Sequence, residues 1–156
     1  MNIPYMRGFD SLNPLALCMA FTATRRVDFP MLDKAGIMYY PNYWDMAHRF
    51  FEESWLDICG VCYPDILDEL KLGFPAVSNE CKFLAPLRYG DDIHCTLWVS
   101  SVGNSSITWE YSFSNGKAEV WRATVVTVCV DMDSLQPEPL PDSLKEGLLA
   151  CAESEV

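Results

Sequence analysis

Residues 27 to 43 combine side chains and backbone groups that could do chemistry on an acyl group. Asp33 precedes Gly36, and Tyr40 and Pro41 lead into a segment that has neither glycine nor proline. A carboxylate can accept a proton or attack a carbonyl carbon. The start of a helix offers unpaired backbone amides and the positive end of a dipole, which stabilise an oxygen that gains charge. Because Pro41 has no amide hydrogen, the N–H of Tyr40 is the better donor.

The same residues also have ordinary structural explanations. Asp commonly shapes a turn just before a glycine-containing loop, and spacing alone favours this role for Asp33. Asn42 could be a helix-start residue that bonds only to nearby backbone. Tyr39 and Tyr43 are expected to pack rather than to act as acid or base, and a lone histidine such as His48 is more often structural. Spacing by itself therefore leaves the roles of these residues open.

The order of these residues resembles the signature of hot-dog-fold acyl-CoA thioesterases of the 4-hydroxybenzoyl-CoA thioesterase type. In that signature an Asp, a small residue and Gly are followed by two apolar positions, an aromatic residue or histidine, and a Pro/Ala-Asn-Tyr that opens a helix. The matching residues run from Asp33 to Tyr43. Further matches, in family order over roughly residues 20 to 140, are Gly60, Pro86-Leu87-Arg88-Tyr89-Gly90-Asp91 and Val102-Gly103-Asn104-Ser105-Ser106.

The resemblance implies hydrolysis of an acyl-CoA or acyl-carrier-protein thioester. Asp33 would be the catalytic carboxylate, either activating water or attacking to form a transient anhydride, and the backbone amide of Tyr40 would stabilise the oxyanion. With this match we prefer the catalytic role of Asp33 to the turn-shaping one. The resemblance further places four residues at the substrate: Gly36, Asn42, Tyr43 and His48. Many relatives carry a Glu at the helix position of His48, which could orient water or Asp33.

Coenzyme A carries phosphates, which this acidic chain must receive locally. The sequence has 11 Lys and Arg against 22 Asp and Glu, a formal net charge of -11, which also argues against nucleic acid or an anionic membrane as the main partner. Candidates for the phosphates are Arg88, Arg122, Lys82 and Lys117, of which we favour Arg88. Where the family has basic residues at one turn, this chain has the uncharged residues 103 to 106.

Two other functions fit parts of the sequence. A non-catalytic hot-dog module could bind acyl-CoA or a protein partner, because one fold hosts many functions. A hot-dog dehydratase or hydratase would want a His in its catalytic loop, and residues 33 to 43 contain none. Only Cys59 and Cys62 have metal-like spacing, without a second pair, so we expect neither a metal nor another cofactor.

Periodicity predicts the elements that must hold these residues in place. Residues 42 to 58 form an amphipathic helix, preceded by Pro41 and stopped by Gly60. Its apolar face contains Tyr43, Met46, Ala47, Phe50, Phe51, Ser54 and Ile58. On the opposite face, Asp45, Arg49 and Glu53 have the spacing of surface ion pairs.

Strands are predicted before and after this helix. The first covers residues 18 to 29 with Phe21, Val27 and Phe29 in one register, and the others cover about 76 to 87, 93 to 102, 106 to 113 and 118 to 131. His94 should point away from the core, and Asn115-Gly116 should form a hairpin turn between the last two strands. The last strand is apolar on both faces and is expected to be central.

The predicted fold is therefore α+β: a long central helix wrapped by an antiparallel sheet of about five strands. With 156 residues we expect one domain, with an extension at residues 1 to 17 and a tail at 133 to 156 containing a short helix from about 142 to 152. The resemblance implies a homodimer or homotetramer with active sites at the subunit interface. Seven scattered cysteines and no signal-like or membrane-spanning start predict a reduced, cytoplasmic protein.

Overall fold

The computed structural model describes residues 20–154 of the chain. Its elements in chain order are β1 (Phe21–Arg26), a 3-10 turn (Phe29–Met31), α1 (Pro41–Cys59), α2 (Tyr63–Asp68), β2 (Leu72–Gly73), β3 (Ala76–Phe83), β4 (Asp92–Val102), β5 (Ser106–Ser114), β6 (Glu119–Val128), β7 (Val130–Asp131) and α3 (Asp142–Ser154). None of the helices described is both long and apolar enough to cross a bilayer.

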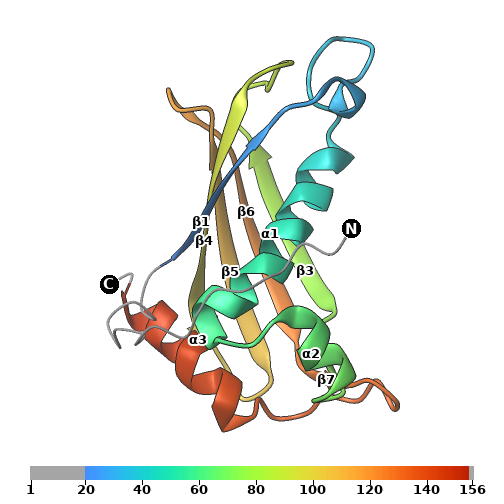
Figure 1. Ribbon diagram of the computed structural model, residues 1–156, viewed down its shortest axis with the longest axis vertical. Coiled ribbons are helices and arrows are strands. Elements are labelled where there is room, and N and C mark those ends of the chain that lie inside the picture. Colours follow the sequence, from blue (N-terminus) through green and yellow to red (C-terminus); the bar gives the residue numbers. More distant parts are fainter. Residues whose placement is uncertain (1–19, 155–156) are drawn as a thin grey trace, which may run out of the picture.

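Five strands form one antiparallel sheet along which α1 lies (Figure 1). The strand order is β1-β4-β5-β6-β3, so β1 and β3 are the edge strands, and β2 pairs with β7 in a separate small sheet. A long helix wrapped by five antiparallel strands is the predicted architecture, and it is confirmed. β6 is an interior strand as expected, but only one of its faces is fully buried, because Arg122 is exposed and Thr124 and Val126 are partly accessible.

Helix α1 is bounded by the two residues that the sequence singled out. Pro41 lies in its first turn, and Gly60 ends it with a φ of 72°, a left-handed conformation that glycine adopts without strain. Every residue predicted for the apolar face is buried, and Trp55 joins them. Large aromatic rings from the sheet pack around this face; the ring centres of Trp109 and Trp55, for example, are 5.3 Å apart. Burial of this aromatic surface fixes the helix on the sheet.

The sheet register follows the predicted alternation. Ile93, Cys95, Leu97 and Val99 are buried, and His94 is exposed, with its Nδ1 3.1 Å from the Thr24 hydroxyl. The β5–β6 turn contains Asn115 and Gly116 as predicted, with Gly116 at a φ of 85°. The side chain of Asn115 accepts hydrogen bonds from two amides of this turn, which stabilises the hairpin.

Several predicted boundaries are wrong. β1 ends at Arg26, and Phe29 lies in the 3-10 turn, where Pro30 follows it and its side chain is 74% exposed. Residues 18 and 19 of that predicted strand lie outside the described residues. β3 ends at Phe83 rather than at residue 87, and the last predicted strand is divided, because β7 leaves β6 to pair with β2.

One of the predicted ion pairs on α1 is also wrong, because Glu53 has a different partner. Arg49 pairs with Asp45 as expected, with Nε 2.9 Å from Oδ2. Glu53 does not join them, because its carboxylate pairs with Arg25 of β1. The Arg25 guanidinium lies 5.3 Å from the centre of the Phe50 ring, so it contacts α1 through both charge and π electrons. This pair links α1 to the β1 edge of the sheet.

The predicted C-terminal helix is present as α3, which packs on the end of α1 (Figure 1). Leu144, Leu148 and Cys151 are fully buried on its inner side. Gly147 lies so close to α1 that an added Cβ would be 2.3 Å from the carbonyl oxygen of Ile58. A backbone atom at this distance cannot move aside as a flexible side chain could.

We predict that Gly147→Ala lowers the free energy of unfolding by about 1–3 kcal/mol, the usual cost of overpacking. The sign is informative, because Gly to Ala in an unobstructed helix stabilises by roughly 0.5–1 kcal/mol. Urea denaturation followed by circular dichroism measures the change. Glu146→Ala, at an exposed neighbouring position, is the control and should change stability by less than about 0.5 kcal/mol. A stabilised Gly147→Ala variant would show that α3 does not pack this closely.

Candidate functional site

The loop before α1 is a narrow hairpin that contains Asp33. The amide of Asp33 donates to the carbonyl oxygen of Ile37 at 2.9 Å, and Leu32 forms an isolated bridge with Met38. Gly36 has a φ of 77°, which the tip of this tight turn requires. The hairpin therefore brings the chain back beside Asp33 immediately before the helix begins.

The Asp33 carboxylate has one engaged oxygen. Its Oδ1 accepts a hydrogen bond from the amide of Ala35 at 2.8 Å, and its side chain is half-buried. This bond is the turn-shaping interaction that spacing alone favoured for Asp33. Within residues 20–154, Oδ2 makes no hydrogen bond to protein and is available to a ligand or a water molecule. Shaping the turn and doing chemistry are therefore compatible in this side chain.

The N-terminus of α1 follows directly on the hairpin. Tyr40 is the residue that precedes the helix, and the amide of Tyr43 donates to its carbonyl at 3.2 Å. Among the residues that the structure describes, none accepts a hydrogen bond from the Tyr40 amide. Pro41 has no amide hydrogen, so the Tyr40 N–H is the first free donor at the positive end of α1.

Asn42 fastens the hairpin to the helix. Its side-chain Nδ2 donates to the carbonyl oxygen of Met31 at 2.8 Å, and the amide of Tyr39 donates to the same oxygen at 2.9 Å. This bond reaches backbone 11 residues earlier in the chain, and not the neighbouring backbone that the structural explanation of Asn42 supposed. The bond fixes the arm of the hairpin that carries Asp33 relative to the first turn of α1.

Arg88 is the predicted phosphate ligand whose backbone lies against the hairpin. It forms an isolated bridge with Ile37, and the amide of Met38 donates to the Leu87 carbonyl at 2.8 Å. Of the other basic candidates, Arg122 is paired with Glu119, and Lys82 is opposite Arg122 in the β3–β6 register. Lys117 belongs to the β5–β6 turn.

Tyr43 lies in the core, so little of its surface is open to the substrate contact predicted for it. Its side chain is 3% exposed, and its ring centre is 5.1 Å from that of Phe83 and 5.8 Å from that of Trp121. Burial is the main cause that raises the pKa of its phenol. Packing, which the residue type suggested, accounts for this position.

His48 is not brought to Asp33 within one chain. It lies eight residues after Tyr40, about 12 Å farther along the helix. Its ring stacks on Phe51, with 5.6 Å between ring centres, and its Nε2 is 3.1 Å from Oε1 of Glu52. The side chain is 61% exposed and lines a separate cavity.

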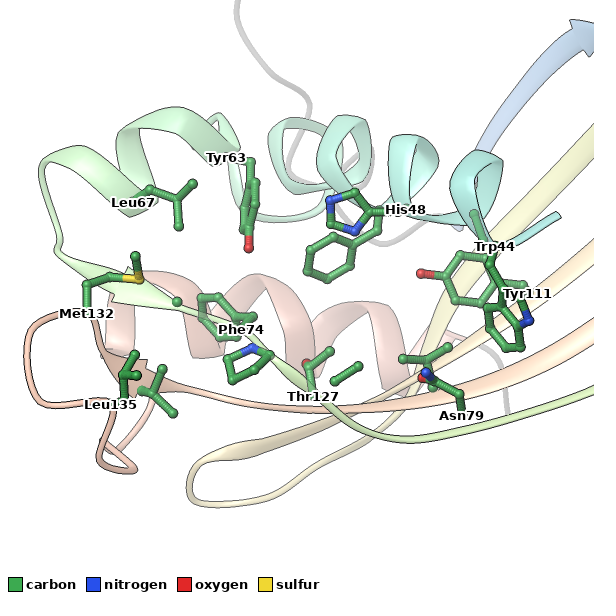
Figure 2. Close-up of a pocket in the computed structure, with 17 residues that line it drawn as sticks. Trp44, His48, Tyr63, Leu67, Phe74, Asn79, Tyr111, Thr127, Met132 and Leu135 are labelled. Atoms are coloured by element: carbon green, nitrogen blue, oxygen red, sulfur yellow. The ribbon is translucent and has the colours of Figure 1, made fainter. Parts of the chain in front are cut away.

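That cavity, of about 520 Å³, lies between α1 and β3 and is mostly apolar (Figure 2). Helix α1 contributes Trp44 and His48, and β3 contributes Asn79. Its other end is formed by residues that the sequence did not suggest: Tyr63 and Leu67 of α2, Phe74, and Met132 and Leu135 after β7. A helix at α2 could have been predicted, because Pro64 and Asp65 occupy its first turn. The meeting of α2 with residues 132–135 depends on the β2–β7 pairing and has no local signal.

Between positions 20 and 154, no three or more His, Cys, Asp or Glu side chains lie together in a way that could hold a metal ion. The groups available for chemistry are a carboxylate, a backbone amide and a helix dipole. Together they are suited to the hydrolysis of an ester or thioester whose carbonyl they polarise.

Comparison with known proteins identifies the family. A 1,4-dihydroxy-2-naphthoyl-CoA hydrolase of Nostoc punctiforme is 29% identical over 130 residues, which cover 83% of this chain and 87% of that protein. The solved structure of a gentisyl-coenzyme A thioesterase is 26% identical, with a TM-score of 0.73 over 80% of this chain and 99% of that one. A Staphylococcus aureus protein solved in complex with CoA shares the fold, with a TM-score of 0.80 at 14% identity over 86% of this chain and 85% of that one.

The expected α+β hot-dog fold is confirmed by these structures. The family model described as the thioesterase-like superfamily matches residues 27–148, a span that includes the hairpin, α1, the strands of the main sheet other than β1, and part of α3. The protein therefore belongs to the thioesterase-like superfamily.

Proposed function

We propose that this protein hydrolyses an acyl-CoA thioester, and that hydroxyaryl-CoA esters are the first substrates to test. The observation that carries the proposal is the hairpin that contains Asp33, is bonded to α1 through the Met31 carbonyl, and ends at the free amide of Tyr40. The relatives act on CoA esters of hydroxylated aromatic acids, as their names state. Esters of an acyl-carrier protein are the alternative substrate, because the same thioester group reacts.

In the proposed reaction the thioester carbonyl oxygen accepts a hydrogen bond from the Tyr40 amide. This donor and the dipole of α1 stabilise the negative charge of the tetrahedral intermediate. A single such donor lowers the activation barrier by roughly 3 kcal/mol. Asp33 removes a proton from water, whose oxygen bonds to the carbonyl carbon. The carbon–sulfur bond then breaks, the proton passes to sulfur, and a free acid and a thiol leave. Direct attack by Asp33, followed by hydrolysis of the anhydride, gives the same products.

The proposed active unit is a dimer formed through β3. This edge strand is exposed along nearly its whole length, and Val77, Phe83 and the following Leu84 are 62%, 50% and 52% exposed. An open edge strand with exposed apolar side chains at both ends favours pairing with another strand. Antiparallel pairing about a two-fold axis brings the Phe83 end of one strand beside the Ala76 end of the other.

This pairing would also give the apolar cavity a function. Ala76 and Asn79 line the cavity, whereas Phe83 contacts Tyr43 at the helix end that carries the hairpin. The catalytic loop of each copy would therefore cover the cavity of the other copy. His48 would then contribute to the site of the second protomer rather than to that of its own chain, and the cavity would receive the acyl group.

Replacing Asp33 with Asn should abolish the chemistry and preserve the fold. Asn keeps the oxygen that accepts from the Ala35 amide but cannot take a proton or attack a carbonyl. We expect turnover to fall by about 100-fold or more, with an unchanged melting temperature and retained binding of CoA esters. Thiol release from a panel of aliphatic, aryl and hydroxyaryl CoA esters measures turnover.

The matched control is Asp131→Asn. Asp131 also accepts a hydrogen bond from the amide two residues ahead, at 3.0 Å, so both substitutions alter a turn-shaping carboxylate. Turnover of this control should stay within about twofold of wild type. If Asp33→Asn behaves in the same way, Asp33 only shapes its turn, and a non-catalytic binding module becomes the better explanation.

Light scattering on dilute protein should give a dimer or a larger oligomer. Val77→Lys should shift the assembly toward the monomer, because a charge on an edge strand opposes strand pairing. Leu149→Lys, at an exposed position on α3, is the control and should leave the mass unchanged. A wild-type monomer that hydrolyses thioesters at full rate would disprove the shared site.

A further inference from the structure

A corner beside the proposed catalytic hairpin carries a pair of exposed aromatic rings. Phe29 and Tyr89 are 74% and 63% exposed, and their ring centres are 6.1 Å apart in an edge-to-face arrangement. Their segments are joined by two backbone bonds, from the Val27 amide to the Asp91 carbonyl at 2.8 Å and from the Gly90 amide to the Val27 carbonyl at 3.0 Å. The rings are thus held on a fixed frame, yet the described fold leaves them in solvent.

Two arginines flank these rings. Arg26 bonds through Nε to Oδ1 of Asp28 at 2.9 Å, and Asp28 is the main cause that raises the pKa of Arg26, with smaller effects from Tyr89 and Asp92. The guanidinium of Arg88 has no ion pair within the described part of the chain. The Asp91 carboxylate nearby accepts a hydrogen bond from the Arg88 amide at 2.8 Å. Arg88 is therefore the cation at this corner that is free to receive an anion.

The corner lies directly against the catalytic hairpin. Arg88 bridges to Ile37, and Leu87 accepts the amide of Met38. A ligand whose thioester lies at Asp33 could therefore extend along this connection to the corner. Its distal part would need a planar group for the rings and negative charge for Arg88.

We propose that this corner binds the adenine nucleotide part of coenzyme A. The adenine stacks on Phe29 and Tyr89, and Arg88 receives the phosphates. Stacking of a base on an aromatic side chain is favourable for every base, and a free guanidinium matches phosphate oxygens in a bidentate manner. The site takes the place of the basic turn that this chain lacks at residues 103–106. The inference rests on the proposed hydrolysis of CoA thioesters.

The test compares two thioesters of the same acid, one with CoA and one with N-acetylcysteamine, which lacks the nucleotide. The variants are Arg88→Gln and the double change Phe29→Leu and Tyr89→Leu, which keeps apolar bulk but removes the aromatic faces. Each should raise KM for the CoA ester by about tenfold or more and change kcat/KM for the short ester by less than about twofold. Melting temperatures should match that of wild type, because these side chains are exposed.

Arg122→Gln serves as the comparison, because Arg122 is also exposed but lies on β6, where it is paired with Glu119. Equal effects on both esters, or a selective loss only in Arg122→Gln, would overturn the proposal. Calorimetric titration of free CoA separates this inference from the proposed reaction. If wild type hydrolyses no thioester but binds CoA more tightly than the corner variants do, the corner is supported and the proposed reaction fails. Equal CoA binding by wild type and variants would refute the corner.

Discussion

The carbonyl oxygen of Met31 joins the two parts of the proposed site. It accepts one hydrogen bond from the backbone of Tyr39 and a second from the side chain of Asn42. Asp33 lies two residues after this carbonyl, and the free amide of Tyr40 follows directly on Tyr39. Together with the Asp33–Ile37 backbone bond and the Leu32–Met38 bridge, these bonds hold the carboxylate and the oxyanion donor on one frame. Such preorganisation lets both groups act without a cost of ordering during the reaction.

The core supplies the rigid frame on which this loop depends. The aromatic face of α1 is buried against the sheet, and the indole of Trp109 donates to the Thr127 hydroxyl at 2.9 Å inside it. The indole N–H groups of Trp55 and Trp121 are buried without a partner among the described residues, a polar cost that the packing of their large rings must offset. A helix held this firmly keeps its N-terminus, and therefore the Tyr40 amide, in one place relative to the sheet.

Local signals predicted the elements that position the site. The bounds of α1 were predicted almost to the residue from Pro41, Gly60 and the apolar periodicity between them. The β5–β6 hairpin was predicted from Asn115-Gly116. The hairpin that carries Asp33 was recognisable as a motif, because its residue order resembles a family signature. The preference for Arg88 among four basic candidates agrees with its position beside that hairpin, although its contact with phosphate remains a prediction.

Interactions between distant segments could not be predicted in the same way. The partner of Glu53 is Arg25 on another element rather than its helical neighbour Arg49, and the bond from Asn42 goes back to Met31 across the loop. Phe29 continued the alternation of the first strand, yet the following Pro30 turns the chain and exposes its ring. The apolar cavity similarly depends on tertiary contacts of α2, β2 and β7. These features follow from three-dimensional packing rather than from the period of any one segment.

The most direct measurement is a crystal structure with a CoA ketone analogue in which a methylene group separates the sulfur from the carbonyl. This compound keeps the carbonyl and cannot be hydrolysed. The proposed site requires the ketone oxygen to lie about 3 Å from the Tyr40 amide nitrogen, with an oxygen of Asp33 or a water bound to it facing the carbonyl carbon. A carbonyl bound elsewhere, with Asp33 making only its bond to Ala35, would contradict the assignment of this loop as the catalytic centre.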